Sequence, residues 1–403
     1  MRLLNPFVLI LLSFGHLVTD LSGGAVPALL PFFQRSFGLS YSSLGFLNGA
    51  FQFTGSVTQP LFGLLTDRVP GRVLLPIACL VTGGGLALTG LAPSYAALLL
   101  LLAVTGVGVA AFHPLGYRLA NQHSGERRGA ATALFSVGGN FGVAIGPLLA
   151  TALVLEFDGQ GTLGMALPGL VMAGLIWWRV PRRPPDTPTR ASDSVAVPLR
   201  SRIPPMGLLT LVVILRSAAS VSLNTFIPLY YIDVVGASET TASQMLSLLL
   251  VSGAVGTLIG GPVSDRFGRL RVLAMTLTLM IPALLVFLNS QGVVAAAALS
   301  LAGLFLVSSF AVTVVMAQDL WPENVGVASG VMVGFAFGVG GLIVPLIGLV
   351  AEHRGLLAAL QVIVVFPVSA VALTILLATA MRRLDRLGSS AASSHGRSIS
   401  AGS

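Results

Sequence analysis

The hexapeptide Gly63-Leu-Leu-Thr-Asp67-Arg68 recurs in the second half of the chain as Gly261-Pro-Val-Ser-Asp265-Arg266. The two aspartates lie 198 residues apart, and so do two prolines inside long apolar stretches, Pro147 and Pro345. One offset shared by two separate landmarks indicates an internal duplication. The 403-residue chain is therefore predicted to consist of two related halves.

Each copy of the hexapeptide follows a long apolar run. Hydrophobic residues make up 55% of the sequence and charged residues 9%, whereas soluble domains carry about 25% charged residues. About 20 apolar residues of helix cross a bilayer core of roughly 30 Å. Runs of this length cover residues 6–33, 44–66, 72–90, 95–121, 127–155, 162–180, 206–233, 242–264, 271–289, 292–317, 324–350 and 355–381. We expect an all-α membrane protein with twelve transmembrane helices in two six-helix pseudo-repeats.

The loops divide the chain into four regions. Residues 1–180 are expected to form the N-terminal half and residues 206–385 the C-terminal half. Residues 181–205 are rich in proline, serine and arginine, which predicts a cytoplasmic linker. Residues 386–403 are rich in serine and glycine, which predicts a disordered cytoplasmic tail. The first apolar run is too long for a signal-peptide core, so we expect it to be retained as a helix.

The arginines set the predicted orientation. The sequence contains 22 arginines and no lysine, and its net charge is +8. With both termini and the linker in the cytoplasm, 19 arginines lie on the cytoplasmic side, Arg35 and Arg354 lie outside, and Arg216 lies within a helix. This asymmetry follows the positive-inside rule. We expect a multi-pass protein of a bacterial inner membrane. Because the arginines occupy short gaps between apolar runs, the high pI does not indicate a nucleic-acid partner.

Several motifs of enzymes are missing. Without a lysine there is no Walker A lysine to bind ATP phosphates, and neither H-E-x-x-H nor G-x-S-x-G occurs. Cys79 is the single cysteine, so no intrachain disulfide can form. We expect no enzymatic activity, no cofactor and no metal. Any energy that the protein uses is then expected to come from gradients of ions or solutes.

The second hexapeptide is part of a longer signature. The pattern G-x-x-x-D-R-x-G-R-R is matched by Gly261, Asp265, Arg266, Gly268, Arg269 and Arg271, and its first-half copy by Gly63, Asp67, Arg68, Gly71 and Arg72. With these two loops, the chain resembles the major facilitator superfamily of transporters over about residues 5–385. The resemblance implies a fold in which helices 1, 4, 7 and 10 line a central cavity.

Within that superfamily the chain most resembles the fosmidomycin resistance exporters. The matching stretches are Gly15-His16-x-x-x-Asp20, Phe112-His113-Pro114 followed by Arg118, Arg128-Gly129, Phe135-Ser136-Val137-Gly138-Gly139-Asn140, and Gly334-Phe335-Ala336-Phe337-Gly338. Leu115 stands where that family often has a glutamate, and the arginine–glutamine motif of drug/proton antiporters is absent from helix 4. The resemblance implies a proton-coupled exporter of small compounds.

His16 and Asp20 are the first candidates for the chemistry of transport. An ionisable side chain in mid-helix costs about 2.5–3.5 kcal/mol to insert, so a transporter is expected to keep few without use. The two residues are four apart and share one face of the first helix. His16 lies roughly 15 Å from the start of that helix. We predict a proton-coupling pair; the alternative is a structural polar pair bonded to a neighbouring helix.

Arg216 and His113 are candidates for substrate binding. Arg216 lies in the seventh helix, the counterpart of the first, where a guanidinium attracts an anion or pairs with Asp20. The alternative is a permanent structural ion pair. His113 precedes Pro114, whose ring removes a helix hydrogen bond, so His113 either binds substrate, senses protonation or satisfies the broken backbone. Three intramembrane amides complete the predicted binding set, with helix–helix contacts as their alternative role: Asn140, Gln52 and Asn224.

The signature loops predict a cytoplasmic gate. A carboxylate at a helix end can cap a neighbouring helix and pair with an arginine, and inward opening would break those contacts. The predicted gate residues are Asp67, Arg68, Arg72, Asp265, Arg266 and Arg269. The alternative is that these charges only set the topology.

Four functions are weighed. The leading hypothesis is a monomeric, proton-coupled antiporter that exports small anionic or amphiphilic compounds, such as phosphonate-type drugs, with protons and membrane lipid as its other partners. The second is uptake or facilitated exchange of an organic-acid metabolite by the same fold. A non-transporting membrane receptor is disfavoured by the paired signature loops, and a membrane-embedded enzyme by the missing catalytic motifs.

Overall fold

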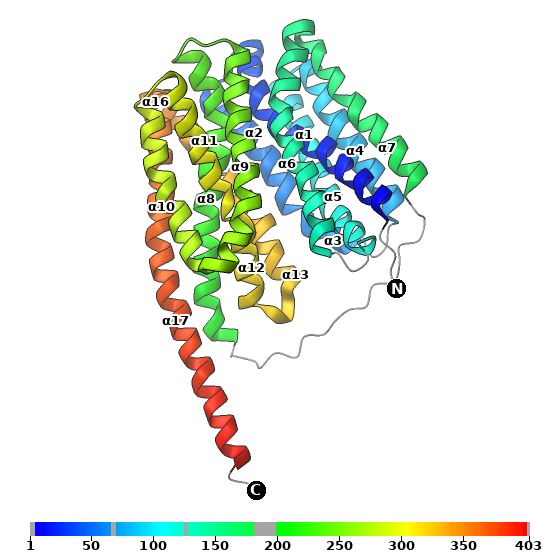
Figure 1. The fold of residues 1–403 in the computed structure, drawn as a ribbon. Coiled ribbons are helices and arrows are strands. Elements are labelled where there is room, and N and C mark those ends of the chain that lie inside the picture. Colours follow the sequence, from blue (N-terminus) through cyan, green and yellow to red (C-terminus); the bar gives the residue numbers. More distant parts are fainter. Residues whose placement is uncertain (1–4, 66–69, 125–127, 181–198, 401–403) are drawn as a thin grey trace.

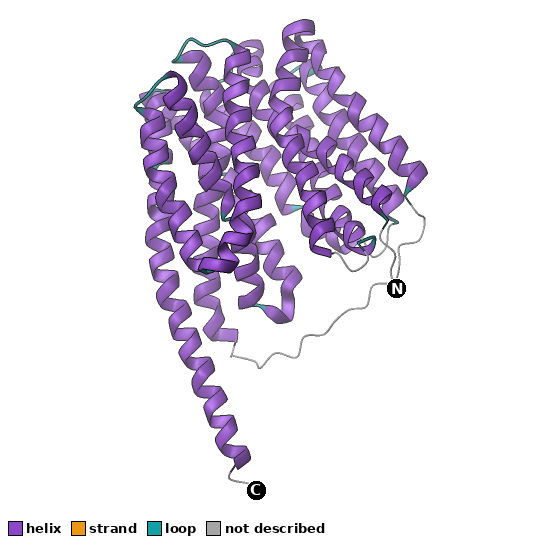
Figure 2. Ribbon diagram, viewed as in Figure 1, coloured by secondary structure: helices purple, strands orange, loops and turns teal. Residues whose placement is uncertain are grey.

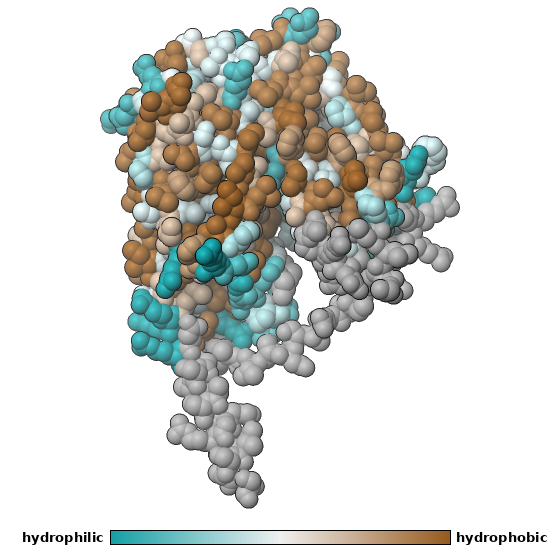
Figure 3. All heavy atoms as spheres, viewed as in Figure 1, coloured by the Kyte–Doolittle hydropathy of each residue, from teal (hydrophilic) through white to brown (hydrophobic). Residues whose placement is uncertain are grey.

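The computed structural model describes residues 5–65, 70–124, 128–180 and 199–400 of the chain. Within these ranges the protein contains helices and short connections and no strand, as Figure 2 shows. Apolar side chains cover the middle of the helices on the face drawn in Figure 3, and polar side chains gather towards the helix ends. This distribution is that of a protein whose helices are surrounded by lipid.

The N-terminal half consists of helices that correspond to the first six apolar runs. They are α1 (Pro6–Phe37), α2 (Tyr41–Val57), α3 (Gln59–Leu65), α4 (Gly71–Ala87) with the 3₁₀ turn η1 (Leu88–Leu91), α5 (Tyr95–Gln122), α6 (Arg128–Phe157), the 3₁₀ segment η2 (Asp158–Met165) and α7 (Ala166–Arg179). The second run is interrupted at Thr58, so it yields α2 and α3.

The C-terminal half repeats this plan. Its helices are α8 (Leu199–Asp233), α9 (Glu239–Phe267), α10 (Arg269–Leu288), α11 (Gly292–Ser308), α12 (Phe310–Leu320), the turn η3 (Pro322–Asn324), α13 (Val325–Gly330), the π-helical segment η4 (Val331–Ala336), α14 (Phe337–Gly341), α15 (Val344–Arg354), α16 (Leu356–Ile363) and α17 (Val365–Ser400). The predicted runs 292–317, 324–350 and 355–381 are thus each divided by short breaks.

Ten continuous stretches of the described residues are long and apolar enough to cross a membrane. The stretch Ala131–Arg179 contains two crossings, because η2 turns the chain back between α6 and α7. The pair α2 and α3 supplies another crossing, which the break at Thr58 divides into two short helices. The fold therefore has the twelve crossings and the two six-helix halves predicted from the sequence.

The two halves contact each other at two interfaces, and each interface is formed by helices from both halves. α2 packs against α14 and α15, and α6 packs against α9. Duplication makes α9 the counterpart of α2, and the helix built from α13 to α15 the counterpart of α6. The two interfaces are therefore related by the same pseudo-two-fold symmetry as the halves, which lie side by side in Figure 1.

The ends of the bundle differ in how the halves meet. We call the end at which α7 ends and α8 begins the linker end, and the opposite end the distal end (Figure 1). Towards the distal end one apolar core includes residues of both halves, such as Leu29, Leu44 and Ile227. Towards the linker end each half has a core of its own, centred on residues such as Phe112 in one and Leu273 in the other.

Three polar contacts also join the halves at the distal end. Arg35 forms an ion pair with Glu239 at 2.5 Å. The Tyr41 hydroxyl donates to Asp233 at 2.9 Å, and the backbone N–H of Ser42 donates to Glu352 at 2.8 Å. The structure is therefore closed at the distal end, and towards the linker end the described residues of the two halves share no apolar core.

Two boundaries differ from those predicted. α8 begins at Leu199, inside the segment 181–205 assigned to the linker, and its first turns are held by an ion pair between Arg202 and Glu323 at 2.7 Å. The linker residues 181–198 lie outside the described ranges. The segment 386–403, predicted to be disordered from its composition, is helical as far as Ser400, because α17 extends without interruption and each added residue gains one backbone hydrogen bond.

Candidate functional site

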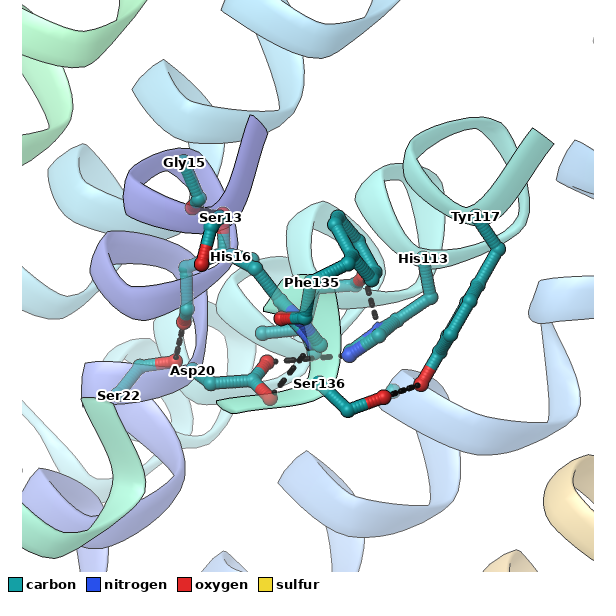
Figure 4. Close-up of polar contacts among 12 residues, drawn as sticks. Ser13, Gly15, His16, Asp20, Ser22, His113, Tyr117, Phe135 and Ser136 are labelled. Atoms are coloured by element: carbon teal, nitrogen blue, oxygen red, sulfur yellow. Dashed lines mark hydrogen bonds and ion pairs between the residues drawn. The ribbon is translucent and has the colours of Figure 1, made fainter. Parts of the chain in front are cut away.

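The carboxylate of Asp20 lies between two histidines in the N-terminal half. Its Oδ2 is 3.1 Å from Nε2 of His16, one turn earlier on α1, and its Oδ1 is 3.1 Å from Nε2 of His113 on α5. Figure 4 shows both rings directed at the same carboxylate. His16 is 3% exposed, and the side chains of Asp20 and His113 are 16% and 18% exposed. None of the three faces the lipid openly.

Backbone carbonyls fix the orientation of both imidazoles. Nδ1 of His16 lies 2.7 Å from the carbonyl oxygen of Phe135 on α6, and Nδ1 of His113 lies 2.9 Å from that of Val109. A carbonyl oxygen only accepts, so each Nδ1 carries the proton. In its neutral form each ring then presents an unprotonated Nε2 to the carboxylate.

This arrangement requires additional protons. A bare Nε2 and a carboxylate oxygen are both acceptors, and they cannot approach each other favourably without a proton between them. Each of the two N···O contacts therefore holds one proton when it is formed. Two such protons would give a carboxylate flanked by two imidazolium rings. We call His16, Asp20 and His113 the triad.

The same three side chains have the donor types of a metal site. One ligand atom from each lies within 4.8 Å of the others, and two imidazoles with a carboxylate are a common ligand set for divalent transition metals. Protons shared across the two N···O contacts would account for the same arrangement.

The surroundings of the triad come from α5 and α6. The ring of Phe135 stacks on His16 with centroids 4.1 Å apart, and Tyr117 on α5 forms a hydrogen bond with Ser136 on α6 at 3.2 Å. A Cβ added to Gly139 would lie 2.5 Å from the His16 ring and 2.7 Å from Oδ2 of Asp20. No role was predicted for Phe135, Tyr117 or Gly139, although Phe135 and Gly139 lie in the stretch 135–140.

Arg216 is the buried cation of the C-terminal half. It is 4% exposed, and its guanidinium carbon lies 5.3 Å from the centroid of the Phe310 ring. Its Nε has no hydrogen-bond partner. Among the described residues no carboxylate pairs with it, so neither a structural ion pair nor a contact with Asp20 is formed. Asp20 and Arg216 each lie 17 residues before the distal end of their helix, a depth of roughly 26 Å.

The three predicted amides occupy less defined surroundings. Asn224 is 9% exposed, and Gln52 and Asn140 are partly buried. None of their side chains forms a hydrogen bond with another described residue. Asn48, which the sequence analysis passed over, instead donates to Thr225 across the two halves at 2.7 Å and leaves its own side-chain oxygen buried and unpaired. A single sequence does not show which asparagines will lie between the two halves.

The predicted gate residues are only partly described. Asp67 and Arg68 lie outside the described ranges. Arg72 lies over Trp177 at 5.0 Å within the N-terminal half, and Arg266 lies 5.6 Å from the ring of its neighbour Phe267. Asp265 is exposed and has no ion pair in the described part of the chain. Arg269 pairs with Asp319, a partner that the sequence analysis missed.

Several known proteins are similar to this chain in sequence. The sequence pattern of the Major Facilitator Superfamily matches residues 12–345 and 208–397. The fosmidomycin resistance protein of Escherichia coli (strain K12) is 33% identical over 355 residues, which cover 86% of each chain. An uncharacterized MFS-type transporter of Bacillus subtilis (strain 168), YfnC, is 31% identical over 371 residues and 90% of each chain.

Solved structures agree with the fold. An inward-facing, occupied bacterial homologue of the human lysosomal transporter Spinster has a TM-score of 0.78 at 17% identity, over 94% of this chain and 98% of its own. A D-xylose–proton symporter has a TM-score of 0.74 at 16% identity, over 92% and 96%. These relatives are transporters and not enzymes. The chain belongs to the major facilitator superfamily and, within it, is similar to the fosmidomycin resistance protein.

Proposed function

We propose that this secondary transporter is a proton-coupled antiporter that exports small anionic or amphiphilic compounds, including phosphonate-type drugs. The observation that carries the proposal is the triad, a carboxylate that faces two imidazoles whose Nδ1 atoms are already committed to carbonyl oxygens. Such a cluster can take up protons as its two contacts form and release them as the contacts separate. His113 thereby joins His16 and Asp20 in proton coupling.

The substrate side of the proposal rests on Arg216. A guanidinium that is 4% exposed and lacks a carboxylate partner among the described residues is costly to bury, and an anionic ligand would offset that cost by a bidentate contact. The names of relatives support an anion. One is called a probable nitrate/nitrite antiporter and another a probable sulfoacetate transporter. Gln52, Asn140 and Asn224 are retained as further candidate contacts.

The gate and the orientation complete this proposal. Both termini lie in the cytoplasm of a bacterial cell, at the linker end, and the protein acts as a monomer in the inner membrane. Asp67, Arg68, Arg72, Asp265, Arg266 and Arg269 meet across the linker end in the opposite conformation. Alternate closing of the linker and distal ends then exposes the triad and Arg216 to one side at a time.

Uptake or facilitated exchange of an organic acid is the second candidate function. The relative named a probable sulfoacetate transporter favours it, with 26% identity over 81% of this chain and 82% of its own. The direction of proton movement separates the two candidates. An antiporter moves protons opposite to the substrate, whereas a proton-coupled importer moves both in the same direction.

The proposal is tested with purified protein in liposomes that carry an imposed pH gradient. Fosmidomycin, simple phosphonates and organic acids serve as substrates, and a pH dye reports proton movement. We expect Asp20→Asn to lower gradient-driven transport about tenfold or more, since a hydrogen bond to a charged group contributes about 1.5–3 kcal/mol. Arg216→Gln should raise the substrate KM and leave proton binding by the triad intact.

The matched control is Asp158→Asn. Asp158 lies in the η2 turn with a φ of 50°, a conformation that asparagine also adopts readily. This variant should transport as the natural protein does. Gradient-driven transport that survives in Asp20→Asn at the natural rate would overturn the coupling assignment, and proton movement in the direction of the substrate would replace export by uptake.

A further inference from the structure

An apolar groove of about 360 Å³ runs along the outer face of the N-terminal half, away from the triad. Its walls are Val73, Pro76, Ile77 and Leu80 from α4, and Leu170, Ala173, Gly174 and Trp177 from α7. Each set has the spacing i, i+3, i+4 and i+7, so each helix contributes one face. The groove extends roughly 10 Å along the helices.

Gly174 lines the groove and leaves space there because it has no side chain. A Cβ placed there would meet no atom within 4 Å, so the missing side chain leaves open space. The rims are open to the outside, because Ile77, Leu170 and Trp177 are 49%, 56% and 52% exposed. Both helices belong to stretches that cross the membrane. The surrounding medium at this depth is hydrocarbon, and a flexible apolar chain is what fits the groove.

Two cations lie where the groove reaches the linker end. The guanidinium of Arg72, in the first turn of α4, lies 5.0 Å from the Trp177 ring. The guanidinium of Arg179, the last residue of α7, lies 4.6 Å from the Trp178 ring. Neither pairs with a carboxylate in the described part of the chain. An arginine held over a ring keeps its N–H edge free, and that edge binds phosphate bidentately.

We propose that this groove binds one acyl chain of an anionic phospholipid, whose phosphate contacts Arg72 while Arg179 adds positive charge beside it. Tryptophan at this height is typical of the membrane interface, and the cytoplasmic leaflet supplies anionic headgroups. A second copy of this chain is a poorer occupant, because it would bring the same cations to the contact. Arg72 is also one of the gate residues proposed above, whereas the groove itself lies away from the triad.

Native mass spectrometry tests the proposal on the full chain. Protein released from nanodiscs that contain phosphatidylglycerol and phosphatidylcholine in equal amounts should retain one phosphatidylglycerol. Arg72→Gln should weaken that retention about tenfold, and Gly174→Phe should abolish it by filling the groove. Inorganic phosphate in place of lipid should not be retained, because it lacks the chain that the groove accepts.

Two control variants distinguish a specific lipid site from a general effect of losing an arginine or adding an aromatic ring. Arg271→Gln removes an exposed arginine from the first turn of α10, the counterpart of α4, and Gly207→Phe adds the same ring at an exposed glycine of α8 whose Cβ position is also open. Both should retain the lipid as the natural protein does. Equal retention of the two lipids, unchanged retention in Gly174→Phe, or a dimer that occupies this face would overturn the proposal.

Discussion

Asp20 is the centre of the candidate site because every group around it is placed by a different helix. α1 supplies His16, α5 supplies His113, and α6 supplies the Phe135 carbonyl that orients His16. The approach of α6 is possible only because residue 139 has no side chain. Its Cβ position lies within 3 Å of both His16 and Asp20, a separation below any ordinary contact between atoms.

Gly139→Ala is therefore expected to impair transport while every ionisable group remains. The methyl group meets the ends of two side chains and no backbone, so the protein should fold with a displaced triad. We expect a fall of about tenfold in gradient-driven transport, which corresponds to the ~1–3 kcal/mol cost of overpacking. Its pH profile should also shift. The control is Gly84→Ala, where the added Cβ meets nothing within 4 Å; an equal loss in both variants would contradict this explanation.

At this scale the sequence predicted the ionisable residues and missed their neighbours. His16, Asp20 and Arg216 could be identified because a charge inside an apolar run is conspicuous. Gly139 and the carbonyl of Phe135 could not, since their roles depend on how closely α6 approaches α1. The role of His113 was left open for the same reason, because its distance from Asp20 depends on the packing of α5 against α1.

At the scale of elements, the closest packing in the N-terminal half is between α1 and α6. Gly138, Gly142 and Gly146 are four residues apart, and a Cβ at any of them would collide with a backbone carbonyl of α1, those of Ser13, Leu17 and Leu21. This series of glycines thus lets the two backbones touch, as small residues do between membrane helices.

Gly142→Ala is expected to destabilise the protein. The obstacle is the backbone of Leu17, so the helices must separate, at a cost of about 1–3 kcal/mol that exceeds the helix propensity gained from alanine, about 1 kcal/mol. Thermal unfolding in detergent should show a lower midpoint. Gly207→Ala on α8, where the Cβ position is open, should leave the midpoint unchanged or raise it. A midpoint for Gly142→Ala at or above the natural value would show that the helices adapt.

A second element-scale prediction concerns the linker end of the C-terminal half. Nη1 of Arg202 donates to both carboxylate oxygens of Glu323 at 2.7 and 2.8 Å, and the hydrogen bond from Arg202 lowers the pKa of Glu323 below its usual 4.5. A carboxyl group whose pKa is lowered on folding stabilises the protein above the unfolded pKa. That contribution is lost as the pH falls below 4.5 through the lower folded pKa.

The measurement is the thermal midpoint as a function of pH. The natural protein should lose more stability below pH 4.5 than Glu323→Gln, which has no carboxylate to protonate there. Glu156→Gln removes an exposed carboxylate of α6 that has no ion pair in the described part of the chain, and it should follow the natural curve. Parallel curves for the natural protein and Glu323→Gln would contradict the assignment.

The positions of breaks within the helices could not be predicted from the sequence. The run 44–66 was predicted as one helix, but it is divided at Thr58, and the run 324–350 contains a π-helical segment from Val331 to Ala336. Periodicity and length report whether a segment crosses the membrane. They do not report where its backbone bends. α2, which ends at the first break, and η4, which forms the second, pack against each other across the two halves.

At the scale of the whole molecule, duplication explains the fold, and the alternating access proposed above assigns it two related arrangements, each open at one end. The shared core near Leu29 and Ile227 and the separate cores towards the linker end describe one of two related arrangements. The repeat of 198 residues predicted two such halves correctly. It carried no information about which end is closed, since both arrangements are built from the same helices.

Removing distal-end contacts is expected to shift the balance towards the opposite arrangement. Exposed ion pairs contribute about 1 kcal/mol or less, so Glu239→Gln alone should change the ratio of the two states by no more than about fivefold. Glu239→Gln combined with Asp233→Asn should shift it further. Spin labels at Ser36→Cys and Thr240→Cys, both exposed, would report a longer distance. Cys79, 1% exposed, should not compete for label.

Glu156→Gln serves again as the control, because Glu156 is an exposed carboxylate on α6 near the same end of the bundle. It should leave the distance distribution unchanged. A distribution that stays unchanged in the double variant as well would mean that the apolar core alone holds the distal end together.

The three distal contacts differ in how they respond to ionic strength. Only Arg35 with Glu239 joins two full charges, whereas a phenol and a backbone amide donate to Asp233 and Glu352. Dissolved ions screen exposed charges beyond about 10 Å at 0.1 M, and they weaken attraction between full charges more than hydrogen bonds from neutral donors. Closure at this end should therefore depend little on the concentration of dissolved salt, because two of the three contacts have neutral donors.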